Sequence, residues 1–426
     1  MEHIEKFQSS KPMNKTDQQS SGKSKGGKLH GKFLVIAALS SIPLVMTLGN
    51  SMLIPVLPSM EKHLNISSFQ TSMIITVYSI LAIILIPIAG YLSDHIGRKK
   101  VIIPSLILTG IGGFIAGWAA WKMEDAYMVI LLGRALQGIG ASGAFPIVLP
   151  LVGDLYKNEE EVSSTLGIIE TSNTLGKVLS PILGAFLAGI IWYIPFFSIP
   201  IFCAISLLLM IFFIKSPKSK AESIPFKQFI NNIKKIFVHN GKWLFAIFTI
   251  GAILMFILFG VLFYLSDVLE KKYAITNVKK GLLLAIPLGA LCLSSFITGK
   301  KIKENKILMK WITFSGIALL SISTAILSFS DQLWFLLGLF VLGGIGIGVS
   351  LPCLDALITE GIEKEQRGTI TSIYSSMRFI GVAAGPPIMA VLMAKTENIL
   401  FYILCGLAAF CVLLTLISIK PDKKTS

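Results

Sequence analysis

Charged residues are scarce in this chain. Asp, Glu, Lys and Arg make up 14% of its 426 residues, whereas they make up about a quarter of a typical soluble protein. Apolar residues come instead in runs of about 20, long enough to cross a bilayer core of about 30 Å as helices. The short alternating segments of membrane-spanning strands are missing, so the backbone is expected to satisfy its hydrogen bonds within helices. The composition therefore excludes a soluble globular protein and predicts an all-α integral membrane protein.

Cysteine is rare as well, and its pattern points to no metal site. The five cysteines lie inside apolar runs, without metal-ligand spacing, where small buried apolar residues are expected; they are Cys203, Cys292, Cys353, Cys405 and Cys411. A Walker lysine motif is missing. The dinucleotide-like pattern Gly138-x-Gly140-x-x-Gly143 lies inside an apolar run without a βαβ unit, so close helix packing explains it. We expect no metal, no cofactor and no enzyme activity.

Twelve apolar runs predict twelve transmembrane helices. Their approximate limits are 33–58, 68–91, 101–121, 127–153, 165–188, 190–214, 243–266, 281–299, 308–329, 333–357, 369–394 and 398–419. The side that holds both termini carries 28 Lys and Arg residues, and the other side carries seven. This bias predicts a cell-membrane protein with both termini in the cytoplasm. The formal net charge of +15 then reflects topology, and no nucleic-acid partner is expected.

The spans divide into two halves that resemble each other. A cytoplasmic linker, 215–242, separates a first bundle, 33–214, from a second, 243–419; residues 1–32 are predicted to be a disordered tail and 420–426 a short one. GIGASGAFP at 138–146 resembles GIGIGVSLP at 344–352, and LGKVLSP at 175–181 resembles IGVAAGP at 380–386. The offsets of 206 and 205 are nearly constant. They predict two pseudo-symmetric six-helix bundles, an architecture of secondary transporters.

Four segments stand out as motifs, and they are LGNSMLIPVLP (48–58), GYLSDHIGRKK (90–100), RALQGIGA (134–141) and GKVLSPILGA (176–185). They resemble motifs of the major facilitator superfamily, and most closely those of its twelve-span drug:proton antiporter branch. The last resembles the span-five antiporter motif, built here on Gly176, Ser180, Pro181 and Gly184, and its small residues allow close helix packing. Ser180 and Ala185 stand where that family usually has glycine. The resemblance implies a transporter with the major facilitator fold, and we expect it to function as a monomer.

The loop between spans two and three combines an acid with three cations. Gly97 permits a tight turn, and the cations keep the loop in the cytoplasm. The resemblance implies that Asp94, four residues after Gly90, faces the start of span eleven, which we expect after Gly368. Arg98 could pair with Asp154. These contacts would form a latch that favours the outward-open state; the alternative is a solvated loop whose charges only set topology.

Several charged and polar residues are expected inside spans, where charges are costly and usually functional. Glu170 is the only carboxylate clearly inside a span and the first choice for carrying a proton; Asp355 is a weaker candidate. The resemblance implies that Arg134 takes part in proton exchange. The substrate cavity is expected to contain Asn50, Asn173, Lys177 and Arg378. The alternative is a static buried network that sets helix packing.

These features predict a proton-coupled exporter of small amphiphilic compounds that works by alternating access, as in multidrug efflux. Span one carries Asn50 and no acid, and the excess of positive charge favours neutral, zwitterionic or anionic substrates. The alternatives are a dedicated exporter of one metabolite or lipid-linked compound, and a proton symporter. A non-transporting membrane sensor is a further alternative, although a sensor would be expected to carry an added soluble domain.

Overall fold

The computed structural model describes residues 15–156, 158–215, 226–302, 305–362, 364–395 and 397–419, and some side chains within them, chiefly in 15–31, 226–240 and 363–369, are not described. The helices are α1 (Lys15–Ser51), η1 (Ile54–Val56), α2 (Leu57–Leu64), α3 (Ser68–Ile96), α4 (Arg98–Lys122), α5 (Tyr127–Ser142), α6 (Phe145–Leu155), α7 (Glu159–Ile190), α8 (Ile194–Phe213), α9 (Phe226–Lys271), α10 (Asn277–Ile302), α11 (Lys306–Ile326), η2 (Leu327–Phe329), α12 (Leu333–Gly361), α13 (Lys364–Met393) and α14 (Glu397–Ser418). Within the described ranges, twelve helical segments are long and apolar enough to cross a membrane. The predicted all-α fold with twelve spans is confirmed. Of the predicted tails and linker, 1–14, 216–225 and 420–426 lie outside this description. Residues 15–32 of the tail belong to α1 and 226–242 of the linker belong to α9, so a helix extends into both, while the domain limits stay predictions.

Two of the spans are broken, which the apolar runs did not predict. Span one passes from α1 through η1 into α2, and span four passes from α5 into α6. In each case a proline stands in the first turn of the next helix: Pro55 in η1, Pro58 in α2 and Pro146 in α6. Proline suits this place because it has no backbone N–H to leave unpaired. The breaks therefore follow from local sequence chemistry.

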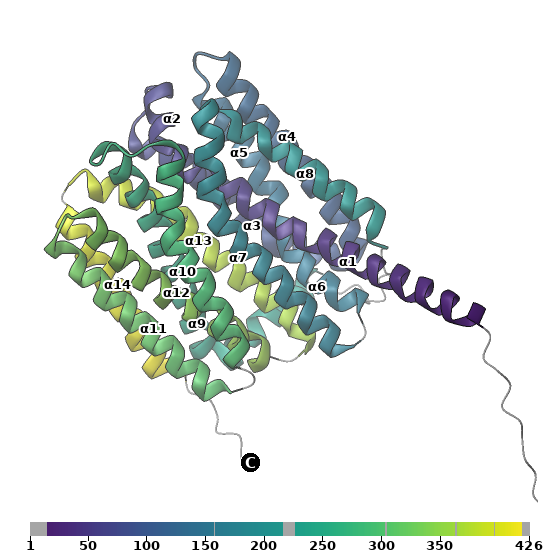
Figure 1. The fold of residues 1–426 in the computed structure, drawn as a ribbon. Coiled ribbons are helices and arrows are strands. Elements are labelled where there is room, and N and C mark those ends of the chain that lie inside the picture. The colour runs from purple at the N-terminus through teal and green to yellow at the C-terminus, as the bar shows by residue number, and fades with distance from the viewer. Residues whose placement is uncertain are drawn as a thin grey trace, which may run out of the picture.

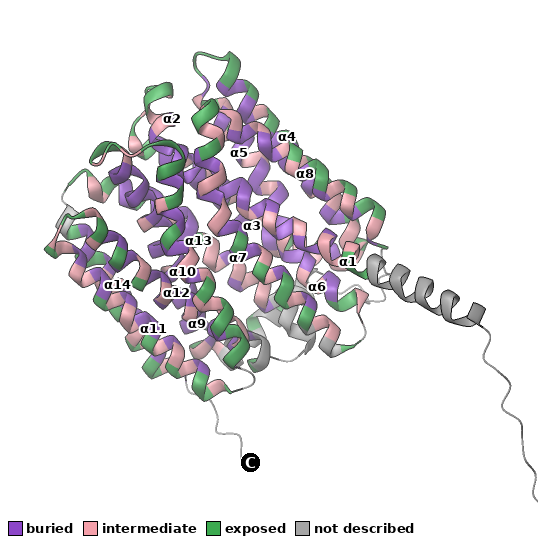
Figure 2. Ribbon diagram, viewed as in Figure 1, coloured by how far each residue is buried: buried purple, intermediate pink, exposed green. Residues whose placement is uncertain are grey.

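The helices form two bundles that meet along two long contacts. Figure 1 shows α1–α8 (purple to teal) beside α9–α14 (teal to yellow). Across the boundary, α3 packs along α13 and α7 packs along α10. Buried residues gather where helices face one another (Figure 2), and exposed apolar residues form stripes on outward faces, such as Ile107, Ile111, Phe114 and Trp118 of α4. Such stripes suit contact with lipid.

The two ends of the bundle can be told apart by the short helices. Successive spans run in opposite directions. The C-terminal ends of α4, α7, α9 and α13 therefore lie on the same side of the bundle as α2, and the C-terminal ends of α3, α8 and α12 lie on the same side as α6. These are called the α2 end and the α6 end below. In the predicted topology the α2 end faces outward and the α6 end faces the cytoplasm.

Candidate substrate and proton pathway

A central cavity of about 90 Å³ lies between the two halves. Its wall is formed by Met46, Thr47, Asn50, Ser51, Tyr78, Ala141, Phe145, Asn173, Lys177, Met255, Phe259, Ser375, Arg378, Phe379 and Val382. All four residues predicted for the substrate cavity are among them. The other side chains are largely aromatic or methionine, which suits an adaptable apolar surface. The cavity can therefore contact an amphiphilic molecule through apolar walls and two cations.

The cations come from opposite halves, and each has an acid near it. Lys177 lies on α7 and Arg378 on α13; the Nη1 atom of Arg378 lies 3.4 Å from Oδ1 of Asp355 on α12. The charges of Glu170 and Asp355 both interact electrostatically with Lys177. An anion entering the cavity would meet one cation from each half, while each cation retains a carboxylate neighbour. Asp355 acts on the cavity through Arg378.

Glu170 belongs to a chain of polar contacts that leads into the cavity. The Nδ2 atom of Asn173 donates to both carboxylate oxygens of Glu170, at 3.2 and 3.4 Å. The Oδ1 atom of Asn173 in turn accepts a hydrogen bond from Thr47, at 2.6 Å. Thr47 and Asn173 line the cavity, so these hydrogen bonds connect the Glu170 carboxylate to the cavity wall. Thr47 was not among the residues predicted from the sequence.

Arg134 is fully buried behind the cavity wall and is satisfied by neutral groups. Its guanidinium donates to the carbonyl oxygens of Ile74 (2.7 Å) and Gly49 (3.0 Å) and to Oδ1 of Asn50 (2.7 Å). It also donates to Gln137, and its Cζ atom lies 4.6 Å from the centroid of the Tyr78 ring. Among the described residues no carboxylate forms an ion pair with it.

This arrangement shows what Arg134 can do chemically. A buried cation without a carboxylate partner is costly unless several dipoles stabilise it. Here it ties span one, span two and span four together through Asn50, Tyr78 and two carbonyls. Gln137 could have been found from its spacing of three residues from Arg134, which places both on one helix face. Tyr78 gave no such signal, because its contact joins different spans.

The span-five motif packs α7 tightly against neighbouring helices. A Cβ atom on Gly184 would lie 1.9 Å from the carbonyl oxygen of Met52, and one on Gly176 would lie 3.2 Å from Cβ of Thr47. The Ser180 hydroxyl donates to the carbonyl oxygen of Gly176, at 2.6 Å, so serine is accommodated where the related motif has glycine. Pro181 lies against the other half, since its carbonyl oxygen would be 2.4 Å from a Cβ on Gly281.

The loop between α3 and α4 forms a charge cluster within the first half. Arg98 pairs with Asp94, and its Nε atom lies 3.2 Å from Oδ2 of Asp154 on α6; its Nη1 atom donates to the Ser93 hydroxyl at 2.7 Å. Gly97 has a φ of +102°, a conformation that favours glycine. The predicted proximity of Arg98 and Asp154 is observed.

The structure describes only part of the predicted contact between this loop and span eleven. The candidate membrane span Ile370–Met393 agrees with the predicted span 369–394, but the helix itself begins earlier, at Lys364, because polar residues before the apolar run continue it. A Cβ on Gly90 would lie 3.4 Å from Oγ of Ser372, which places α3 directly against α13. The side chains of 363–369 lie outside the description, and the latch between the halves stays a prediction.

No group of three His, Cys, Asp or Glu side chains in the described part of the chain is placed to hold a metal ion.

Comparison with known proteins agrees with this geometry. The family model described as Major Facilitator Superfamily matches residues 39–386 and 309–426. The Bacillibactin exporter of Bacillus subtilis (strain 168) is 57% identical over 394 residues, covering 92% of this chain and 97% of that protein. Tetracycline resistance protein, class C, of Escherichia coli is 23% identical, covering 82% and 87%. Multidrug resistance protein 2 of Bacillus subtilis is 24% identical, covering 85% and 89%.

A solved structure has the same fold. The human organic anion transporter MFSD10 aligns with a TM-score of 0.72 and 18% sequence identity, covering 90% of this chain and 99% of that one. At this identity the likeness extends to the arrangement of the helices and carries no information on substrate.

Proposed function

The chain belongs to the Major Facilitator Superfamily, and from this premise we propose that it is a proton-coupled exporter of amphiphilic anions. It is a multi-pass membrane protein of the efflux type, as its relatives are. Beyond this, we infer that its substrate is anionic and that transport is coupled to protons. We also infer that it lies in the cell membrane with both termini in the cytoplasm and acts as a monomer.

The observation that carries the proposal is the pair of cations on the cavity wall. Lys177 and Arg378 come from opposite halves, so an anionic group between them contacts both halves at once. Contacts of this kind change when the halves rock about a central site, which is how alternating access works. Aromatic and methionine side chains on the same wall would bind the apolar part of the substrate. The two positive charges on the wall would also repel a cationic substrate.

Bacillibactin is the first compound to test. The relative named for its export is 57% identical and matches over 97% of its length, whereas the relatives named for tetracycline and multidrug resistance are 23% and 24% identical. This favours a dedicated exporter over a broad one. Multidrug efflux is the second candidate, supported by the adaptable apolar wall.

We assign proton binding to Glu170, with Asp355 as a second site. Glu170 contacts the cavity through Asn173 and Thr47, and Asp355 contacts it through Arg378. Arg134, bonded to neutral partners, holds Asn50 in place on the wall. An inward proton gains about 2.3 kcal/mol per 100 mV of membrane potential, and each outward negative charge gains the same. Both terms therefore drive the export of an anion.

Uptake into inside-out membrane vesicles tests the substrate. With an imposed proton gradient, we expect vesicles with the parent protein to accumulate bacillibactin, and Lys177→Gln to reduce the rate at least about tenfold, because a hydrogen bond to a charged group contributes about 1.5–3 kcal/mol. Lys279→Gln, at an exposed position on α10, is the matched control and should not change the rate. Equal uptake by Lys177→Gln and parent would refute the anion site. Faster transport of tetracycline than of bacillibactin would favour the multidrug alternative.

A further inference from the structure

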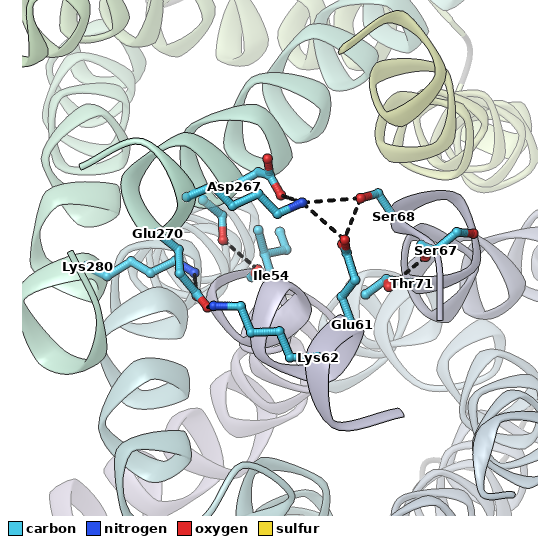
Figure 3. A network of polar contacts seen from close by, with 11 residues as sticks. Ile54, Glu61, Lys62, Ser67, Ser68, Thr71, Asp267, Glu270 and Lys280 are labelled. Atoms are coloured by element: carbon cyan, nitrogen blue, oxygen red, sulfur yellow. Dashed lines mark hydrogen bonds and ion pairs between the residues drawn. The ribbon is translucent and has the colours of Figure 1, made fainter. Parts of the chain in front are cut away.

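Six charged side chains cluster at the α2 end, where the two halves meet (Figure 3). Three are acids and three are lysines, and neither the cavity nor the predicted latch includes them. They are Glu61 and Lys62 on α2, Asp267, Glu270 and Lys271 on α9, and Lys280 on α10. The first two belong to the first half and the other four to the second. Their position raises the question of what holds the halves together at this end.

Two ion pairs cross from one half to the other. The Nζ atom of Lys62 lies 2.9 Å from Oε1 of Glu270, and Nζ of Lys271 lies 3.1 Å from Oε1 of Glu61. The Ser68 hydroxyl donates to the other oxygen of Glu61, at 2.7 Å. Figure 3 shows the side chains of α2 reaching toward those of α9. These pairs must separate if the halves move apart at this end.

The crossing residues of the second half each have another partner within that half. Oε2 of Glu270 lies 2.9 Å from Nζ of Lys280, and Nζ of Lys271 lies 2.8 Å from Oδ1 of Asp267. When the crossing pairs separate, Glu270 and Lys271 therefore keep an opposite charge. The side chains of Glu61 and Lys62 would then be hydrated, and that of Lys62 is already 63% exposed. Opening thus leaves no buried charge unpaired, which is the usual cost of breaking such a network.

Close packing supports the same contact. The Ser266 hydroxyl on α9 donates to the carbonyl oxygen of Ile54, at 3.0 Å, which joins the halves beside the ion pairs. On α10, a Cβ atom at Gly281 would lie 2.4 Å from the carbonyl oxygen of Pro181. Glycine is needed there for α7 and α10 to approach so closely. Polar contacts and helix packing therefore close the same end.

The network borders a larger opening at the α2 end. Asp267, Lys271 and Ser68 line a vestibule of about 610 Å³. Ser51, three residues before Ile54, lines the central cavity. Because span one continues from Ser51 through η1 into α2, Glu61 and Lys62 lie farther toward the α2 end than the cavity does, so a substrate leaving at this end would pass the level of the ion pairs.

We propose that the ion pairs Lys62–Glu270 and Glu61–Lys271 form a gate that closes the cavity toward the outside and opens to release substrate. This inference rests on the proposed transport function and on the predicted orientation, in which the α2 end faces outward. Asp267 and Lys280 hold the gate residues of the second half in place while it is open. The gate controls access to the cavity and does not select the substrate.

Labelling of a cysteine in the cavity tests the gate without any substrate. Ser51→Cys is reacted, in intact cells, with a maleimide that cannot cross membranes; the chain without this change gives the background from the native cysteines. Adding Glu61→Gln and Lys62→Gln should make labelling about fivefold faster, equivalent to about 1 kcal/mol for two partly exposed ion pairs. The matched control is Lys272→Gln with Asp331→Asn, which removes a 3.0 Å ion pair within the second half and should leave the rate unchanged.

A second variant keeps all the charges. Gly281→Ala should also speed labelling severalfold by separating α7 from α10, whereas Gly289→Ala on the same helix, where a Cβ would meet nothing within 4 Å, should not. Unchanged labelling in both gate variants, or an equal rise in the Lys272 and Asp331 control, would overturn the gate. Faster labelling in cells whose vesicles do not accumulate bacillibactin would refute the proposed substrate and leave the gate standing.

Discussion

The ion pairs that the structure describes at the two ends of this molecule differ in what they connect. At the α2 end, Lys62–Glu270 and Glu61–Lys271 join one half to the other. At the α6 end, Arg98 pairs with Asp94 and Asp154, and all three belong to the first half. An ion pair within a half moves with that half and survives rocking, but a pair between halves must break. The comparison indicates that this structure is held closed at the α2 end, so the network there reports the conformational state.

The largest effect, a loss of thermal stability, is expected from a substitution that disturbs helix packing within one half. Gly184→Ala places a methyl group 1.9 Å from the Met52 carbonyl oxygen, and such overpacking costs about 1–3 kcal/mol. We expect a clearly lower temperature of thermal unfolding for the purified protein. Gly167→Ala on the same helix, with nothing within 4 Å, is the control. If both variants unfold at the same temperature, α7 does not pack as described.

Removing the centre of the network at the α6 end should affect transport next most. Arg98→Ala removes two ion pairs at once and leaves Asp94 and Asp154 facing each other. We expect the transport rate in vesicles to fall about fivefold, since two partly exposed pairs contribute about 1 kcal/mol in total. Lys100→Ala keeps both pairs and should behave like the parent. A similar loss in both variants would mean that loop charge alone matters.

A smaller effect is expected from Asp94→Asn, because it keeps the Arg98–Asp154 pair. We expect the transport rate to fall about threefold and labelling of Ser51→Cys from outside to slow, as the proposed latch favours the outward-open state. The two readouts are measured on the same cells. Unchanged transport together with unchanged labelling would reject the latch and leave a loop whose charges only set topology.

The smallest effect is expected from an exposed pair within the first half. Lys32→Gln removes an ion pair with Glu161 whose partners are 47% and 40% exposed. Transport and labelling should stay within about twofold of the parent, because exposed pairs contribute little. A change as large as that of the gate variants would erase the distinction between pairs within and between halves.

The sequence predicted the fold well because apolar runs of the right length have few other solutions in a membrane. It also singled out Asn173 and Lys177, since a polar group is costly inside a span unless it serves a site. The structure places these residues on one wall, while their roles stay proposals. The breaks in spans one and four were missed although Pro58 and Pro146 signalled them.

The network at the α2 end could not be predicted in the same way. Lysines and acids are common at the ends of spans, and the sequence pattern of these lysines indicated only the orientation of the protein in the membrane. Glu61 and Lys271 are 210 positions apart, so their pairing depends on which ends of the two halves meet. Tyr78 and Arg134 pose the same difficulty, because a contact between spans leaves no periodic signal.

Proton flux in proteoliposomes tests the central claim most directly. Purified protein is reconstituted into liposomes that contain a pH-sensitive dye, and bacillibactin is supplied on one side of the membrane. The dye then reports proton movement in the direction opposite to the flow of substrate. We predict substrate-driven proton movement with the parent protein and its loss in Glu170→Gln, because this carboxylate is tied to the cavity wall through Asn173. Coupled flux of undiminished size in Glu170→Gln would contradict the assignment of Glu170, and substrate flux without any proton movement in the parent would contradict the account as a whole.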